Sequence, residues 1–238
     1  MRLHRFYVNR NVTQPLGEEI VVDDVSTIKQ WYRVFRYKQD DHVILFDGHN
    51  VDYEYSIVSI TPTEATLGFV SKLELPPLRK QVTLYLSIIK KDNFELVVQK
   101  CTELGVTTIV PIISERSEKK NLSLERLRTI AIEASEQSGR ATIPTISDIK
   151  TLENAFSTRN ELDAHYICDM GGVLLSDILS RDISMKTSIS LWVGPEGGWG
   201  PLDKEIFASK TTTTISTGSN VLRAETAAII ISSFFLLL

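Results

Sequence analysis

Hydrophobic residues are arranged differently in the first third of the chain and in the rest. Up to about residue 72 they form short β-branched and aromatic runs separated by turn residues such as Asp47–Asn50. The runs predict strands at Arg5–Val8, His42–Phe46, Tyr53–Ile60 and Ala65–Val70, with one helix around Ser26–Phe35. Short strands at this spacing are typical of a small β-barrel. The paired prolines of Leu73–Pro77 indicate a linker after it.

From Gln81 onward, apolar segments alternate with amphipathic ones. Val82–Ile89 is a continuous apolar run, as expected for a buried strand of a parallel sheet. Asp92 and Glu95 open a helix whose apolar residues recur with a period of 3.6 until Gly105. Further strands are predicted at Thr107–Ile113, Ala164–Cys168, Ser188–Val193 and Thr212–Ile215, and further helices from Ser123 to about Gly139 and from Pro201. This alternation predicts an α/β domain with a mostly parallel sheet.

The chain ends in an apolar run, Ala227–Leu238, which is too short for the roughly 20 residues of a membrane span. It predicts a buried helix or an oligomer interface instead. The two cysteines, Cys101 and Cys168, form neither a disulfide framework nor a metal-binding pair. Because no signal peptide is recognisable, we expect a cytoplasmic location. The helical period predicts that Cys101 belongs to the core.

Charge adds one feature to this picture. The net charge is −4, yet residues 1–38 hold seven Lys and Arg against four acids, and residues 39–76 hold one Lys against seven acids. A basic N-terminal segment is suited to phosphate. The alternative is an ordinary solvated surface.

Two glycine-bearing loops follow expected strands, at the edge where parallel sheets bind their ligands. They are Gly194–Gly200 and Thr217–Arg223, and each precedes an expected helix. Glycine lets the backbone approach a ligand and offer it N–H and C=O groups. The pattern favours one shared pocket, with structural turns as the alternative. Trp192, beside the first loop, is predicted to be a core residue rather than a platform for a base.

The signatures of several other sites are missing from the sequence. No Lys-Ser or Lys-Thr pair follows the glycine loop, as a P-loop requires, and no GxSxG nucleophile elbow occurs. The first strand of the α/β domain runs into Lys90–Asn93 without the glycines of a dinucleotide fold. The four histidines lack the spacing of metal ligands, so we expect no metal.

Several motifs carry a resemblance to a known family. Gly194–Gly198 (GPEGG) followed by Val221–Ala227 (VLRAETA) resembles the SPOUT class of RNA methyltransferases. Further matching segments are Leu96–Gly105 (LVVQKCTELG), Ser114–Ser117 (SERS), Ala131–Arg140 (AIEASEQSGR), His4–Val8, Arg33–Arg36 and Leu45–Gly48. Together they resemble the RsmE family, the 16S ribosomal RNA uridine-N3 methyltransferases, over nearly the whole chain. The chain departs from that family at Ile88–Asn93 and at Ala224, where relatives often have Thr.

The resemblance implies a PUA-like RNA-binding β-barrel at residues 1–72 and a trefoil-knot SPOUT methyltransferase domain at residues 73–238. It also implies a homodimer whose interface includes the last helix, in agreement with the apolar C-terminal run. S-adenosylmethionine is then held by a loop at Asp169–Met170 and by the two glycine-bearing loops. The expected cofactor-binding residues are Met170, Val193, Gly194, Pro195, Glu196, Gly197, Gly198, Ser216, Thr217, Gly218, Asn220, Val221 and Leu222.

Arg223 and Glu225 are the expected catalytic residues. Uracil N3 carries a proton with a pKa of roughly 9 to 10, comparable to that of a phenol, and this proton must leave as the methyl group arrives. A guanidinium does not act as a base, so Arg223 is expected to stabilise negative charge on a uracil oxygen or to hold a phosphate. Glu225 is a candidate base or a partner of Arg223; the alternative is a carboxylate that serves the helix dipole.

The expected RNA-binding residues are Arg5, Arg33, Arg36, Arg116 and Arg140. Glu133, Gln137 and Arg140 are spaced to share one helix face, either turned to the site or solvated. For Arg116 and Glu103 an internal ion pair is an equal alternative. Two other functions stay open on the sequence alone: a SPOUT enzyme acting on transfer RNA or on a ribose 2′-oxygen, and a catalytically silent RNA-binding assembly factor.

Overall fold

The computed structural model describes residues 3–9, 17–118, 121–178, 187–208 and 211–237. Arg2 and Arg10 of the basic N-terminal segment lie outside these residues. The chain divides into two compact units. One comprises residues 1–77 and 135–142, and the other comprises residues 78–134 and 143–238.

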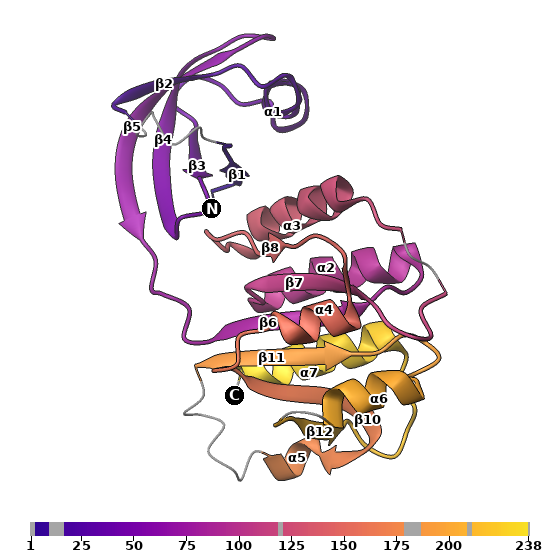
Figure 1. The fold of residues 1–238 in the computed structure, drawn as a ribbon. Helices are drawn as coiled ribbons and strands as arrows, with labels where there is room; N and C mark the ends of the chain where they lie inside the picture. Colours follow the sequence, from indigo (N-terminus) through magenta and orange to yellow (C-terminus); the bar gives the residue numbers. More distant parts are fainter. Residues whose placement is uncertain (1–2, 10–16, 119–120, 179–186, 209–210, 238) are drawn as a thin grey trace. The chain divides into compact units, whose positions relative to one another are not determined.

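The first unit is built on a five-stranded sheet with the strand order β1-β3-β4-β5-β2 (Figure 1). Neighbouring strands are antiparallel except for β1 and β3. The strands are β1 Arg5–Tyr7, β2 Glu19–Val22, β3 His42–Phe46, β4 Val51–Ile60 and β5 Ala65–Glu74. The sheet curls around buried side chains that include Phe6, Trp31 and Tyr55, so the expected barrel takes the form of a half-barrel.

Three details of this unit differ from the sequence prediction. Strand β2 is not predicted, because four residues are too few to establish an alternating pattern. Strand β5 continues through Glu74 into the expected linker, since the β4–β5 hairpin pairs as far as Val51 with Glu74 before the two prolines. The expected single helix is a short α-helix, α1 Val25–Lys29, followed by a π-helix, η1 Gln30–Phe35.

The second unit is an α/β structure around a parallel sheet with the order β12-β10-β11-β6-β7-β8, in which β9 also pairs with β7. Its strands are β6 Gln81–Ser87, β7 Thr108–Ile113, β8 Thr145–Ile146, β9 Lys150–Thr151, β10 Ala164–Leu174, β11 Ser188–Val193 and β12 Thr213–Ser216. Its helices are α2 Lys91–Leu104, α3 Leu124–Ser138, α4 Leu152–Ser157, α5 Leu175–Ile178, α6 Pro201–Ala208 and α7 Ala224–Leu237. Residues 135–138 at the end of α3 belong to the first unit.

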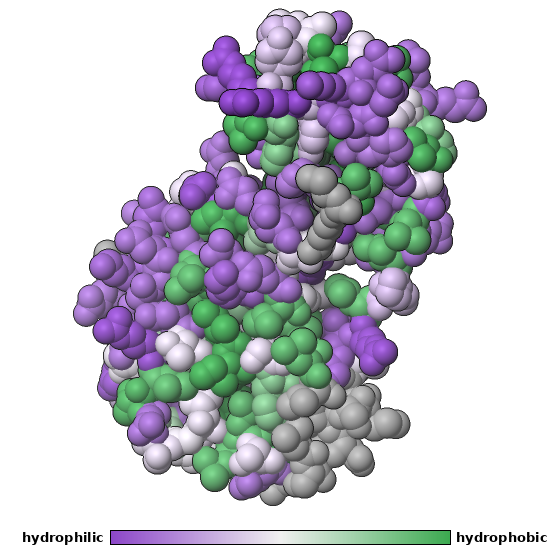
Figure 2. Space-filling view, turned by 180° about the vertical axis from the view of Figure 1, so that it is seen from behind, coloured by the Kyte–Doolittle hydropathy of each residue, from purple (hydrophilic) through white to green (hydrophobic). Residues whose placement is uncertain are grey.

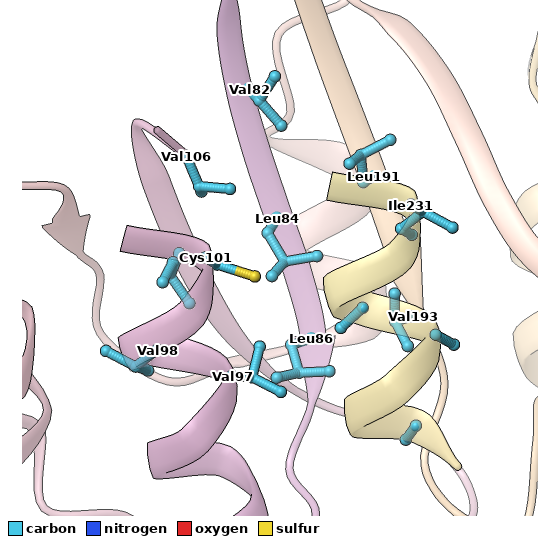
Figure 3. Close-up of a cluster of buried hydrophobic side chains, with 14 of the residues drawn as sticks. Val82, Leu84, Leu86, Val97, Val98, Cys101, Val106, Leu191, Val193 and Ile231 are labelled. Carbon is cyan, nitrogen blue, oxygen red and sulfur yellow. The ribbon is translucent and has the colours of Figure 1, made fainter. Parts of the chain in front are cut away.

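Helices cover both faces of this sheet, which explains why its strands read as continuous apolar runs (Figure 1). In β6, Val82, Leu84 and Leu86 face the cluster under α2 and α7. Tyr85 faces the opposite cluster, which contains residues of α4 and α6. Figure 3 shows the first cluster, where the side chain of Cys101 from α2 points toward Leu84. Cys101 is fully buried, as predicted.

Strand β10 is longer than predicted because it contains an irregularity. Its register with β12 shifts between Cys168 and Val173. A Cβ atom on Gly172 would lie 2.5 Å from backbone atoms of Ile215, so only glycine allows the two strands to approach there. Asp169 and Met170 therefore belong to a strand, which corrects the expected loop.

The apolar C-terminal run forms α7, whose residues Ala228, Ile231 and Phe235 are fully buried. This confirms the expected buried helix. Among the helices of the described residues, none combines the length and apolar character needed to cross a membrane. The short elements β8, β9, α4 and α5 are not predicted, because two to six residues give no measurable period.

Candidate functional site

A pocket of about 410 Å³ opens beside the middle of β10 and the carboxyl ends of β11 and β12. Three segments line it: the middle of β10, the loop after β11, and the segment from the end of β12 into the first turns of α7. The lining residues are Cys168, Asp169, Met170, Val193, Gly194, Pro195, Glu196, Gly197, Gly198, Trp199, Ser216, Thr217, Val221, Leu222, Arg223, Ala224 and Ala227.

Most of the sequence-predicted cofactor residues are brought together here. Gly218 and Asn220 are not among the lining residues. Cys168, Trp199, Ala224 and Ala227 line the pocket as well, although they are not among the sequence-predicted cofactor-binding residues. The available signals are the position of Trp199 directly after the glycines and the place of the two alanines in the VLRAETA segment, whereas Cys168 carries none.

The loop after β11 is a tight turn held from several sides. The amide of Gly198 donates to the carbonyl oxygen of Pro195 at 2.8 Å, and Gly198 has a φ of +68°. The indole Nε1 of Trp199 donates to the carbonyl oxygen of Cys168 at 2.9 Å. The Glu196 carboxylate accepts from the amide of Lys90 at 3.2 Å. The loop is therefore tied to the middle of β10 and to the residue directly before α2.

The SERS segment contacts the same loop. Ser114 exchanges hydrogen bonds of 3.0 Å with Ser87 and Ser117, which anchors the turn after β7. Arg116 donates through Nη1 to the carbonyl oxygen of Gly197 at 2.8 Å. Arg116, which is predicted from the sequence to contact RNA, is thus hydrogen-bonded to the pocket wall in this structure.

At the other side of the pocket, the backbone after β12 turns at Gly218, which has a φ of +132°. The Ser216 hydroxyl stabilises this turn because it accepts from the amide of Gly218 at 3.3 Å and donates to its carbonyl oxygen at 3.1 Å. Val221 is 82% exposed at the pocket mouth.

Arg223 and Glu225 lie at the start of α7 with opposite exposure. The Arg223 side chain is 84% exposed, and its Nη1 lies 4.0 Å from Oε1 of Glu225, whose side chain is 10% exposed. The second oxygen of Glu225, Oε2, is buried and has no hydrogen-bond partner among the described residues. The pair places an exposed cation at the pocket mouth and an incompletely satisfied carboxylate behind it.

Burial also affects the cysteine in the pocket wall. Desolvation, aided by the nearby charge of Asp169, raises the pKa of the Cys168 thiol to about 11. This thiol is therefore protonated at neutral pH and is poorly suited to act as a nucleophile. Asp169 itself forms an ion pair of 2.8 Å with Lys204 of α6.

The other predicted RNA contacts differ in their surroundings. Arg33 and Arg36 are exposed around the end of η1. The Arg5 side chain is only 8% exposed, pairs with Asp52 at 2.6 Å and donates to the carbonyl oxygen of Gly139. Arg140 donates through Nε to Thr142 at 2.8 Å, and burial lowers its pKa to about 10.

Three further expectations concern charged and aromatic residues. Helix α3 ends at Ser138 and Gly139 has a φ of +83°, so Arg140 does not share a helix face with Glu133 and Gln137, and that expectation is wrong. Glu103 pairs with Lys100 at 2.9 Å, as in the ion-pair alternative. Trp192 is fully buried and stacks on Tyr85 at 3.7 Å between ring centroids, which confirms its core position.

Comparison with known proteins defines the class. The family described as an RNA methyltransferase domain matches residues 76–236. Ribosomal RNA small subunit methyltransferase E of Rickettsia conorii is 33% identical over 96% of this chain and 93% of its own length. The protein of the same name from Aquifex aeolicus is 30% identical over 86% of this chain and 89% of its own length. The chain belongs to the family of ribosomal RNA small subunit methyltransferase E.

Solved structures agree with this assignment. Ribosomal RNA small subunit methyltransferase E from Neisseria gonorrhoeae, bound to S-adenosyl methionine, matches with a TM-score of 0.85 and 27% identity over 98% of this chain and 96% of that chain. A methyltransferase from Legionella pneumophila, in complex with the cofactor SAM, matches with a TM-score of 0.87 and 26% identity over 99% of this chain and 97% of that chain.

Proposed function

We propose that this protein transfers the methyl group of S-adenosylmethionine to N3 of a specific uridine in the 16S ribosomal RNA of the small subunit. The observation that carries the proposal is the pocket at the strand ends of the second unit, with Arg223 at its mouth. It occurs in a chain that belongs to a family of ribosomal RNA methyltransferases and is built like two structures determined with this cofactor.

The residues of the pocket fit S-adenosylmethionine. Its volume of about 410 Å³ lies within the roughly 300–1,000 Å³ of small-molecule sites. Met170, Leu222 and Ala227 offer apolar surface to an adenosyl group, while the loop Gly194–Gly198 and Thr217 offer backbone polar groups. When bound, the cofactor supplies an electrophilic methyl group, and the residues of the chain orient the acceptor and manage its charge.

Arg223 is suited to stabilising the charge that develops on the acceptor. Removal of the N3 proton spreads negative charge over the adjacent uracil oxygens, and a guanidinium offers several donors in one plane to such oxygens. The exposure of Arg223 leaves it free to meet an RNA base from outside. Donors aimed at developing charge make large contributions to catalysis.

Glu225 is suited to a supporting role next to Arg223. Its Oε1 is already 4.0 Å from the guanidinium, and its buried Oε2 lacks a hydrogen-bond donor among the residues that the structure describes. A buried carboxylate with unused acceptor capacity favours orienting the arginine or accepting a proton from the acceptor. Its place in the first turn of α7 also stabilises its negative charge.

The RNA partner is proposed to be held partly by the first unit. Arg33 and Arg36 are exposed there and can reach phosphates without breaking a described ion pair. Arg5 would first have to leave Asp52, so its phosphate contact demands a rearrangement that the other two do not. An overall negative chain can still bind RNA when its cations are clustered.

A homodimer through α7 and a cytoplasmic location complete the proposal. On α7, Ile230 is 37% exposed and Leu237 is 69% exposed, and half-buried Ile229 and Phe234 lie close in sequence. Figure 2 shows hydrophobic residues gathered on the face seen from behind, the side on which α7 lies in Figure 1. A second copy of the chain would remove such a surface from water.

The experiment that tests the reaction is methyl transfer from labelled S-adenosylmethionine to small ribosomal subunits that lack the modification, followed by nucleoside mass spectrometry. N3-methyluridine is the expected product. A different methylated nucleoside would overturn the proposed acceptor. Absence of both incorporation and cofactor binding would overturn the methyltransferase assignment itself.

A further inference from the structure

The loop that forms one wall of the pocket has little rigidity of its own. Between Gly194 and Gly200 it contains four glycines, and glycine loses the most backbone freedom when a chain becomes ordered. One described backbone hydrogen bond, from Gly198 to Pro195, closes the turn within the loop. A pocket wall of this kind needs support from outside if it is to be in place before the ligand arrives.

Two carboxylates provide a reciprocal connection at the end of this loop. Asp203 of α6 is 3% exposed, and its Oδ2 accepts from the amide of Gly200 at 2.9 Å, while its Oδ1 accepts from the amide of Glu115 at 3.1 Å. In return, Oε2 of Glu115 accepts from the amide of Leu202 at 2.9 Å. Each carboxylate therefore binds an amide of the segment that carries the other.

This connection completes a helix cap that the local sequence leaves unfinished. Gly200 stands in the N-cap position of α6, where Ser, Thr, Asn or Asp would accept a hydrogen bond from the second or third residue of the helix. Glycine has no side chain to do so. Asp203, at the third helical position, satisfies the amide of Gly200, and Glu115 from the SERS segment satisfies the amide of Leu202.

Gly200 and Glu115 also fit each other sterically. A Cβ atom built on Gly200 would lie 2.0 Å from Oε2 and 2.9 Å from Cβ of Glu115. The glutamate thus occupies the space that the missing side chain leaves. Any larger residue at position 200 displaces the carboxylate from the helix end.

The connection leads to the pocket through Trp199. This residue precedes Gly200, donates its indole N–H to Cys168, and presents its ring to Gly194, where a Cβ atom would lie 3.2 Å from ring atoms. Trp199 and Gly194 both line the pocket, whereas Glu115 and Asp203 are not among its lining residues. By holding Gly200, Glu115 and Asp203 therefore hold the pocket wall in place without contacting the ligand.

We propose that Glu115 and Asp203 are positioning residues that hold the Gly194–Trp199 wall of the S-adenosylmethionine pocket in its binding conformation. The proposal rests on the proposed function for the identity of the ligand. It assigns to the glutamate of the SERS segment a role in cofactor affinity rather than in the chemistry of methyl transfer.

The first test compares Glu115→Ala and Glu115→Gln with the wild-type protein by calorimetric titration with S-adenosylmethionine and by steady-state kinetics. We expect Glu115→Ala to weaken cofactor affinity about tenfold while kcat at saturating cofactor changes by less than about twofold. Glu115→Gln keeps an oxygen acceptor and should recover most of the affinity. Thr151→Ala is the matched control, because Thr151 caps α4 with an acceptor bond to the amide of Asn154 and does not line the pocket.

Thr151→Ala should lower Tm because α4 loses its N-terminal cap, but it should leave cofactor affinity unchanged. Wild-type affinity in Glu115→Ala at a temperature well below its Tm would overturn the proposal. So would an equal loss of affinity in Thr151→Ala.

A second measurement separates this proposal from steric damage at Gly200. In a double-mutant cycle, the factor by which Gly200→Ala weakens cofactor affinity is compared in two backgrounds. This factor should be at least about threefold smaller in the Glu115→Ala background than in the wild-type background, because the carboxylate that the substitution displaces is already absent. Equal costs in the two backgrounds would contradict the proposal.

A third measurement does not depend on the ligand. The Trp199 indole N–H, assigned with Trp199→Phe, should exchange with solvent faster in Glu115→Ala than in the wild type or in Thr151→Ala. If wild-type protein does not bind S-adenosylmethionine, the proposed function fails, and the indole exchange still decides whether the two carboxylates hold the wall. Unchanged exchange in Glu115→Ala would overturn that role.

Discussion

The indole N–H of Trp199 donates a hydrogen bond of 2.9 Å to the carbonyl oxygen of Cys168, and this bond joins the glycine loop after β11 to the middle of β10. Both residues line the same pocket although 31 positions separate them in the chain. The bond sets the distance between two pocket walls.

Trp199→Phe should therefore weaken S-adenosylmethionine binding by about three- to tenfold, the size expected for one lost internal hydrogen bond of about 0.5–1.5 kcal/mol. Calorimetric titration measures this change. Trp31→Phe is the matched control, because the Trp31 indole N–H is buried in the first unit without a hydrogen-bond partner among the described residues. Equal losses in the two variants would contradict a specific role for the Trp199 bond.

Removal of the charge at Arg223 should affect the chemical step more than cofactor binding. We expect Arg223→Ala to lower kcat on saturating RNA by about 10²–10³-fold, the usual effect of losing a donor to developing charge. Cofactor affinity should stay within about threefold, because the side chain is 84% exposed at the pocket mouth. Near-normal turnover in single-turnover assays would show that the guanidinium does not stabilise the acceptor.

The thiol of Cys168 should react slowly and become faster with rising pH. Its pKa is raised to about 11, so below that value the thiolate fraction, and with it alkylation by iodoacetamide, should increase about tenfold per pH unit. Saturating S-adenosylmethionine should protect it, since Cys168 lines the pocket. Intact-mass spectrometry measures both effects, with fully buried Cys101 as the internal reference. A rate that levels off between pH 8 and 9 would contradict the raised pKa.

Adjacent glycines in β10 should differ in their tolerance of a methyl group. Gly172→Ala places a Cβ atom 2.5 Å from the backbone of Ile215, so the β10–β12 pairing must open, and we expect a loss of about 1–3 kcal/mol in the free energy of unfolding. Gly171→Ala meets nothing within 4 Å and serves as the control. Denaturant unfolding compares the two. Equal stabilities would mean that the close strand approach does not occur in solution.

A charge on the exposed side of α7 should separate the proposed dimer. Ile230→Asp replaces a 37% exposed apolar side chain in the middle of the helix and should shift the protein to monomers in sedimentation velocity. Glu125→Lys, at an exposed position of α3, tests whether a change of surface charge elsewhere has the same effect. A wild-type protein that is monomeric at micromolar concentration would overturn the dimer.

The sequence alone predicts the elements whose physical signals are long and local. Continuous apolar runs indicate β6, β7 and β11, because a strand that is buried on both faces has apolar residues at successive positions. The period of 3.6 residues with a terminal glycine indicates α2, because a helix that is buried along one stripe repeats its apolar residues at that period. The glycines of the segments Gly194–Gly200 and Thr217–Arg223, each after an expected strand, likewise indicate both loops of the pocket from residue types alone.

Only the tertiary structure decided which distant residues share the pocket and how they are held. Gly172 matters because of Ile215, Arg5 is removed from the surface by Asp52, and Glu115 completes the cap of α6 from 87 positions away. No local period records such pairs, because each depends on how the strands are ordered rather than on neighbours in the chain. The sequence by itself determined the long strands and helices and the residue types available for methyl transfer. Packing determined which of those residues face the pocket and which support it, because contacts across the sheet form only when the chain has folded.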